Sequence, residues 1–117
     1  MNRPELLKHV LWLFIEDYSG LWEVVWEINS RYRHLTEAER LELARQAVNE
    51  LISRGWVALY RCQEPYGDMV PLKPEEYEDV ILNPKHWEEP HAGSVSVRIS
   101  ATEAGERAYR SEFEGFE

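Results

Sequence analysis

Apolar residues recur at three- and four-residue intervals in the first third of the chain. The first series consists of Leu6, Leu7, Val10, Leu11, Phe14 and Ile15, and the second consists of Leu21, Val24, Val25 and Ile28. This spacing places each series on one face of an α-helix. Because Ser19-Gly20 interrupts the pattern, the chain is predicted to form two helices, at 5–18 and 21–31.

A third helix, at 37–54, is predicted by signals at both of its ends. Thr36 and Glu39 form a capping box, in which each side chain accepts a hydrogen bond from the other residue's main-chain amide. Gly55 stands where helices commonly end in a left-handed residue. The apolar stripe of this helix, which we expect to be buried, consists of Leu41, Ala44, Val48, Leu51 and Ile52.

Two later segments have the pattern of β-strands. Residues 56–62 are rich in aromatic and branched side chains, and the three apolar residues of 95–100 alternate strictly with Ser, Arg and Ser. We expect these two strands to pair antiparallel. A last helix is predicted at 101–112, because Thr102 and its neighbours form a capping sequence.

Residues 63–94, between the two strands, contain five of the six prolines and so exclude a long regular element. A short helix is predicted at 74–82. Four apolar residues, Tyr77, Val80, Ile81 and Trp87, are expected to anchor this insertion to the body of the protein. The tail at 111–117 is expected to make few contacts with the rest of the chain.

The order of these elements resembles the winged-helix superfamily and is similar to small bacterial winged-helix transcription regulators. The resemblance lies in two joins, NELISRGWVALYR at 49–61 and VRISATEAGERAYR at 97–110. It implies one α+β domain over 1–117, with three N-terminal helices, a two-stranded antiparallel wing that carries a long, Pro-rich, acidic insertion, and a C-terminal helix.

Charge is distributed unevenly along the chain. The 22 acidic and 13 basic residues give a net charge of −9, and residues 63–94 hold eight acidic and two basic residues, a net charge of −6. Excess negative charge disfavours nucleic acid, whose phosphates need basic contacts. An anionic partner therefore has to meet residues 31–61.

The resemblance makes the polar face of the third helix a DNA-recognition surface. Arg, Gln and Asn side chains can read base edges, and arginines before the helix can hold phosphates. The candidate DNA-binding residues, of which those on the helix are expected to be exposed, are Arg31, Arg33, Glu42, Arg45, Gln46 and Asn49. The alternative is that this face is an ordinary solvent-exposed helix surface without a partner.

Tryptophan suggests a different kind of partner. Five Trp residues are more than one small core easily buries. Trp12, Trp22 and Trp26 are candidates for an exposed surface that binds a protein or a second copy of the chain. The alternative to a DNA-binding regulator is thus a winged-helix protein-interaction or adaptor module, which does not bind DNA and uses its acidic wing or its Trp-rich face.

The sequence contains no pattern typical of catalysis, a cofactor or a metal. Cys62 is the only cysteine, and its position in a strand favours core packing over nucleophilic chemistry. His86 and His91 are five residues apart, which is not the spacing of a common metal motif. We therefore expect a non-enzymatic protein without cofactor or metal.

No segment is predicted to cross or bind a membrane. The longest apolar run, Val10 to Ile15, has six residues, against about 20 for a spanning helix. With one cysteine and no secretory signal pattern, the sequence predicts a cytoplasmic protein.

We predict a homodimer that associates through the first and last helices. One module contacts few base pairs, and the aromatic content exceeds what a small core requires. Sedimentation at micromolar concentration should give the mass of a dimer. A monomer would weaken the regulator hypothesis more than the adaptor hypothesis, because an adaptor can act alone.

Overall fold

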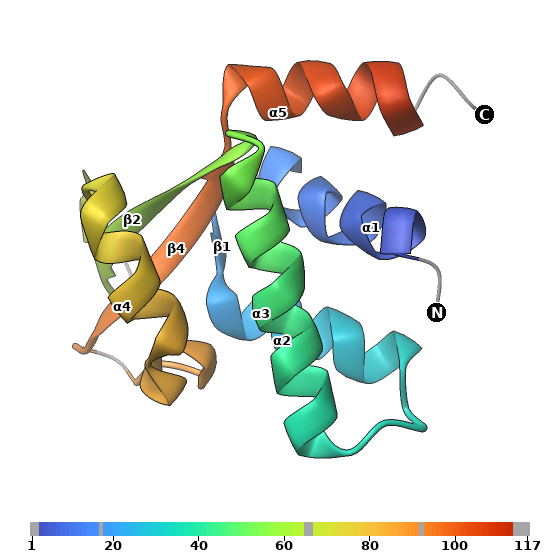
Figure 1. Cartoon of the computed structure of the whole chain (residues 1–117). Coiled ribbons are helices and arrows are strands. Elements are labelled where there is room, and N and C mark those ends of the chain that lie inside the picture. The colour runs from blue at the N-terminus through green and yellow to red at the C-terminus, as the bar shows by residue number, and fades with distance from the viewer. Residues whose placement is uncertain (1–2, 17, 65–66, 92, 114–117) are drawn as a thin grey trace.

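The computed structural model describes residues 3–16, 18–64, 67–91 and 93–113 (Figure 1). The helices are α1 (Arg3–Glu16), α2 (Leu21–Arg31), α3 (Glu37–Ser53), α4 (Tyr77–Leu82) and α5 (Glu103–Ala108), with short 3-10 turns η1 (Pro74–Glu76) and η2 (Pro84–Trp87) and a π-helical turn η3 (Tyr109–Phe113). The strands are β1 (Ser19–Gly20), β2 (Val57–Gln63), β3 (Met69–Pro71) and β4 (Val95–Ala101). The chain is therefore α+β, as the sequence predicts.

The strands form one antiparallel sheet in the order β1-β4-β2-β3. The predicted pairing of the two long strands is confirmed, in a register that joins Val57 to Ala101 and Gln63 to Val95. The expected two-stranded sheet is wrong, because β1 and β3 add a short strand at each edge. Strands of two and three residues are too short to show an alternating pattern in the sequence.

The core lies between the sheet and the first three helices. Val57, Leu59, Val97 and Ile99 alternate along β2 and β4 and are all buried. On the helical side, the fully buried residues are Val10, Leu11, Phe14, Leu21, Val24, Ile28, Ala44, Val48 and Leu51. Most residues of the apolar series that predicted the helices therefore lie in the core, and the others pack against it.

Helix α3 has the ends that the sequence predicts. The Thr36 hydroxyl accepts from the Glu39 amide, and the Glu39 carboxylate accepts from the Thr36 amide. At the other end Gly55 has φ +74°, and its amide donates to the Ile52 carbonyl in a Schellman arrangement. The predicted apolar stripe needs one correction, since Leu41 and Ile52 are only half-buried.

The insertion folds back against the body, as predicted. Val80, Ile81 and Trp87 are buried, together with Leu72, and Tyr77 is half-buried. The Tyr77 hydroxyl accepts a hydrogen bond from the Leu59 amide of β2 at 3.2 Å. These anchors place α4 beside α3 (Figure 1).

The boundaries of the outer helices differ from those predicted. Helix α1 begins at Arg3 and ends at Glu16 rather than spanning 5–18. Helix α5 begins at Glu103, because Ala101 still pairs in β4 and the Thr102 side chain caps the helix by accepting from the Gly105 amide. The predicted tail begins inside η3, and 114–117 lie outside the described residues.

We expect Leu51→Ala to lower the free energy of unfolding by about 2–5 kcal/mol, because Leu51 is fully buried and its removal leaves a cavity. Asn49→Ala, on the exposed side of the same helix, is the matched control and should change stability little. Urea unfolding of both variants measures the difference. Equal losses would contradict this account of α3.

Candidate functional site

The polar face of α3 is occupied in part by α4. The Arg45 guanidinium donates to the carbonyl groups of Ile81 and Leu82, at 3.3 and 3.4 Å. Its side chain is only 20% exposed. The expectation of an exposed Arg45 is therefore wrong, because the end of α4 binds it.

Three side chains bind the last carbonyl groups of α4. Besides Arg45, the Trp87 indole donates to the Ile81 carbonyl at 2.9 Å, and a ring nitrogen of His86 lies 3.0 Å from the Val80 carbonyl. A short helix leaves its C-terminal carbonyl groups without internal partners, and a cation there is favourable. Arg45 thus links the insertion to α3.

The other predicted DNA-binding residues of α3 remain exposed. Glu42, Gln46 and Asn49 are all on the surface, and Gln46 donates to the Glu42 carboxylate at 3.5 Å. The same carboxylate lies 4.0 Å from Arg45. Of the base-reading side chains on α3, Gln46 and Asn49 are therefore the two that are exposed.

The two arginines before α3 are separate from this face. Arg31, at the end of α2, binds the Glu27 carboxylate one turn earlier at 2.5 Å. Arg33 lies in the turn after α2 and is exposed. One of the two candidate phosphate ligands is thus already paired within its own helix.

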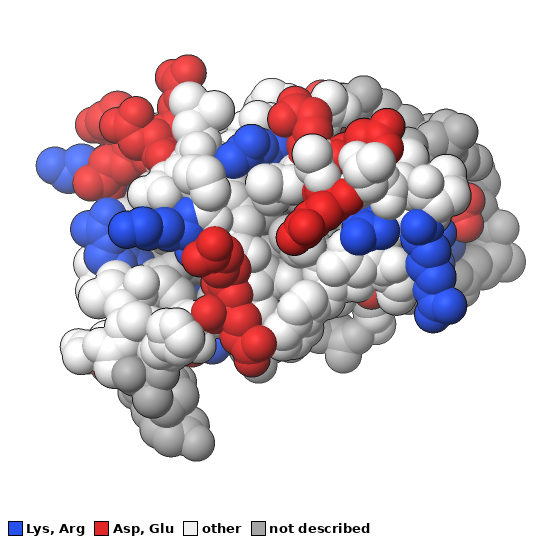
Figure 2. Space-filling model, turned by 90° about the horizontal axis from the view of Figure 1, so that it is seen from below, with Lys and Arg blue, Asp and Glu red and all other residues white. Residues whose placement is uncertain are grey.

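The charge around α3 is mixed. The helix itself carries four acidic residues, Glu37, Glu39, Glu42 and Glu50, and two basic residues, Arg40 and Arg45. Seen from below the view of Figure 1, the described surface carries Lys and Arg side chains interspersed with Asp and Glu (Figure 2). Such a surface lacks the continuous positive potential that attracts a phosphate backbone.

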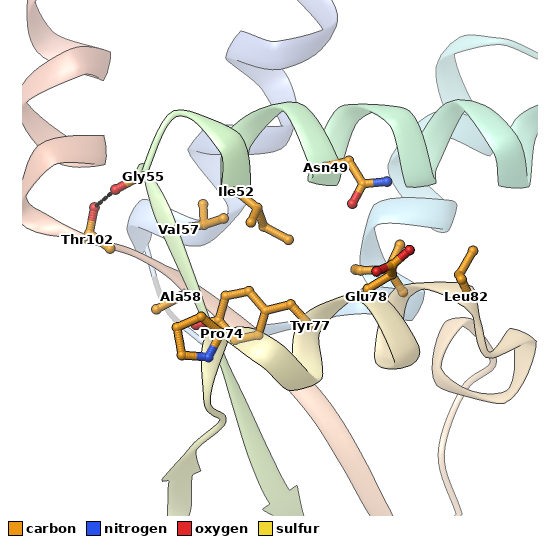
Figure 3. A pocket seen from close by; sticks show the side chains of 11 residues that line it. Asn49, Ile52, Gly55, Val57, Ala58, Pro74, Tyr77, Glu78, Leu82 and Thr102 are labelled. Atoms are coloured by element: carbon orange, nitrogen blue, oxygen red, sulfur yellow. Dashed lines mark hydrogen bonds between the residues drawn. The ribbon is translucent and has the colours of Figure 1, made fainter.

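A groove of about 690 Å³ lies between α3, α4 and the start of β2 (Figure 3). Its lining residues are Asn49, Ile52, Gly55, Val57, Ala58, Pro74, Tyr77, Glu78, Ile81, Leu82 and Thr102. Asn49 and Ile52 project from α3 toward Tyr77, Glu78 and Leu82 on the opposite wall. This volume lies within the range of pockets that bind ligands.

The lining of the groove has few polar side chains. Most of its lining is apolar, and Leu82 is 60% exposed at one end. Among the described residues that line it, Glu78 is the only charged one, and its side chain makes no ion pair or hydrogen bond with the described residues. The sequence placed its walls in separate segments, so only the structure reveals the groove.

The three candidate partner-binding tryptophans do not form one surface. Trp12 and Trp26 are 44% and 50% exposed, whereas Trp22 is buried at 6%. Including Trp22 was wrong, because its ring packs against Gly20, where a Cβ atom would lie 2.0 Å from the ring, and under the Arg98 guanidinium. Trp12 instead contacts the Tyr109 ring, with centroids 5.4 Å apart.

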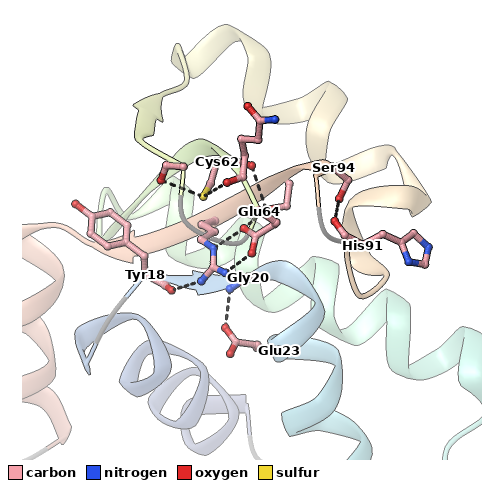
Figure 4. A network of polar contacts seen from close by, with 11 residues as sticks. Tyr18, Gly20, Glu23, Cys62, Glu64, His91 and Ser94 are labelled. Atoms are coloured by element: carbon pink, nitrogen blue, oxygen red, sulfur yellow. Dashed lines mark hydrogen bonds and ion pairs between the residues drawn. The ribbon is translucent and has the colours of Figure 1, made fainter.

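A partly buried ion pair that the sequence analysis missed joins the start of the insertion to β4 (Figure 4). Arg98 binds both carboxylate oxygens of Glu64, at 2.6 and 2.8 Å, and donates to the Tyr18 carbonyl at 3.0 Å. The Ser96 hydroxyl donates to the same carboxylate at 2.6 Å. The bonds from Arg98 and then Ser96 lower the pKa of Glu64 from 4.5 to about 2, against the opposing effect of burial.

Cys62 lies beside this pair and is buried, as expected for a core residue. Burial raises the pKa of its thiol, and the adjacent Glu64 acts in the same direction. A protonated, buried thiol is a poor nucleophile. Within the described residues, His, Cys, Asp and Glu side chains do not gather in groups of three that would hold a metal ion.

Comparisons with known protein families, curated proteins and solved structures found no match to this chain. In the part of the chain that the structure describes, none of the helices has the length and apolar character needed to span a membrane.

We expect Glu64→Gln to lower the free energy of unfolding by about 3–5 kcal/mol near neutral pH, because it leaves Arg98 half-buried without its counter-charge. The pKa of Glu64 is about 2 in the folded state and 4.5 in the unfolded state. The stabilisation that its carboxylate contributes to the fold is therefore complete above pH 4.5 and is lost as the pH falls through about 2. Urea unfolding between pH 2 and 6 should show the difference from wild type shrinking toward pH 2.

Glu27→Gln is the control for this experiment. It removes one partner of an exposed pair with Arg31, which contributes about 0–1 kcal/mol. A Glu64→Gln difference that stays constant from pH 6 to pH 2 would contradict the role of its carboxylate.

Proposed function

We propose that this chain is a non-enzymatic winged-helix module that binds a basic protein segment in the groove between α3 and α4. The observation that carries the proposal is the contact of Arg45 with the end of α4. The side chain best suited to read guanine is bound internally, and the two residues whose carbonyl groups it binds, Ile81 and Leu82, line an apolar groove.

Charge supports a basic partner. Residues 67–91 of the insertion contain seven acidic residues and two basic ones. Glu75, Glu78 and Asp79 are exposed on or beside α4. Surfaces of opposite sign steer association and select partners, so an acidic rim around an apolar groove favours a segment with cations beside apolar anchors.

The winged-helix assignment is supported by the order of the main elements. Three helices, the paired strands β2 and β4 and a final helix follow one another as in that superfamily. The short strands β1 and β3 and the folded insertion are departures from the expected two-stranded wing. We place the module in the cytoplasm, on the basis of its single, buried cysteine.

Binding of duplex DNA by a dimer is the function that the resemblance favours, and it stays a prediction. Gln46, Asn49 and Arg33 are exposed and available for it. Two features oppose it. Arg45 would have to leave α4, and the acidic residues of α4 would lie beside the phosphate backbone.

A salt titration with labelled generic duplex DNA separates the two functions. We expect weak or absent binding at low ionic strength for wild type, for Arg45→Ala and for the control Gln46→Ala. Binding of the DNA backbone by a cluster of basic side chains would instead give an affinity that falls steeply as the salt concentration rises. Such a salt dependence in wild type, together with a lower affinity for DNA in Arg45→Ala, would overturn the proposal.

A peptide experiment tests the groove itself. The probes are capped seven-residue peptides that alternate Lys or Arg with Val, Leu or Phe. We expect Leu82→Asn to weaken binding about tenfold, because a buried Leu side chain contributes about 1.5–3 kcal/mol. Val70→Asn is the matched control, since Val70 is 57% exposed on β3, away from the groove. Equal affinity of both variants would contradict binding in the groove.

A further inference from the structure

The floor of the groove is a strand edge without a neighbouring strand. Strand β3 pairs with β2 only from Tyr60 to Cys62. One residue earlier, the Leu59 carbonyl accepts from the Leu72 amide at 3.0 Å, and the Leu59 amide donates to the Tyr77 hydroxyl. The chain then turns away through η1, so the first residues of β2 have no strand on this side.

The main-chain groups of Val57 point into this gap. In an antiparallel pair, the amide and carbonyl of one residue face the same side, and the side alternates along the strand. Since both groups of Leu59 face away from β4, those of Val57 do so too. The bond from the Thr102 amide to the Trp56 carbonyl, at 2.9 Å, fits the same alternation.

Val57 is thus an unpaired donor and acceptor at the base of the groove. It lines the groove, is only 4% exposed, and forms no hydrogen bond with the described residues on this side. Main-chain polar groups that are buried without a partner cost free energy. A ligand with a donor and an acceptor at this position would form the two main-chain hydrogen bonds that Val57 lacks, and these bonds would favour its binding.

We propose that the partner segment binds in an extended conformation and pairs with Val57 as a short added strand. This inference rests on the proposed function and specifies its binding mode. A helical segment would not satisfy Val57, because a helix bonds its own main-chain groups internally. An extended segment presents free amides and carbonyls along each edge, as in other cases of β-strand addition.

The walls of the groove define the side chains of this segment. Ile52 of α3 and Leu82 of α4 provide apolar contacts on opposite walls. Glu78 lies in the same lining without an ion pair among the described residues. Successive residues of a strand point to opposite sides. In a segment that alternates apolar and basic residues, the apolar side chains would therefore contact the apolar lining and the basic ones would face Glu78.

The test uses the alternating peptides in two N-methylated forms, with the methyl groups on odd or on even residues. An added strand pairs through one edge only. We therefore expect one form to lose binding at least tenfold and the other to bind like the parent peptide. In nitrogen-15 spectra of the full chain, the Val57 amide signal should shift downfield and exchange more slowly with solvent.

Protein variants supply the charge control. Glu78→Gln should weaken binding of the peptides several-fold, whereas Glu89→Gln, exposed after η2 and outside the lining, should not. Shifts confined to the methyl groups of Ile52 and Leu82, with Val57 unchanged, would overturn the extended mode and leave the proposed function standing. Equal loss in both N-methylated forms would also overturn it. If no peptide shifts any groove signal, both proposals are wrong.

Discussion

Antiparallel pairing of β2 with β4 is the interaction on which the rest of the molecule depends. It runs from Val57 with Ala101 to Gln63 with Val95, and it closes the chain between these strands into a loop. Just beyond the last pair, Glu64 binds Arg98 of the opposite strand. Because both ends of the insertion are held, its apolar residues reach the core, and α4 comes to lie beside α3. The groove is thus a consequence of the sheet.

Those parts of the fold that depend on neighbouring residues could be predicted from the sequence. The capping box at Thr36, the left-handed Gly55 and the periodic apolar residues give α3 almost to the residue. Strands β1 and β3 could not be predicted, because two or three residues carry no period and their pairing depends on β4 and β2. The burial of Trp22 depends likewise on close approach to Gly20.

Prediction of the candidate site was less complete, because its walls come from segments distant in the sequence. The polar face of α3 was recognised, and two of its residues, Gln46 and Asn49, are exposed as expected. Arg45 was misplaced because its partners, the carbonyl groups at the end of α4, follow 36 and 37 residues later. A main-chain acceptor has no signature in a sequence, so neither this contact nor the edge at Val57 could be read from residue types.

The two walls of the groove differ in what stabilises them. Helix α3 has 17 residues and belongs to the core, whereas α4 has six and is far shorter than a helix that is stable alone. Lengthening a loop costs only about 0.6 kcal/mol for each doubling. Insertions, and substitutions at exposed positions of 67–91, can therefore reshape one wall while the buried anchors Leu72, Val80, Ile81 and Trp87 keep their places in the core. In evolution, the surface of this wall can change at little cost to the stability of the fold.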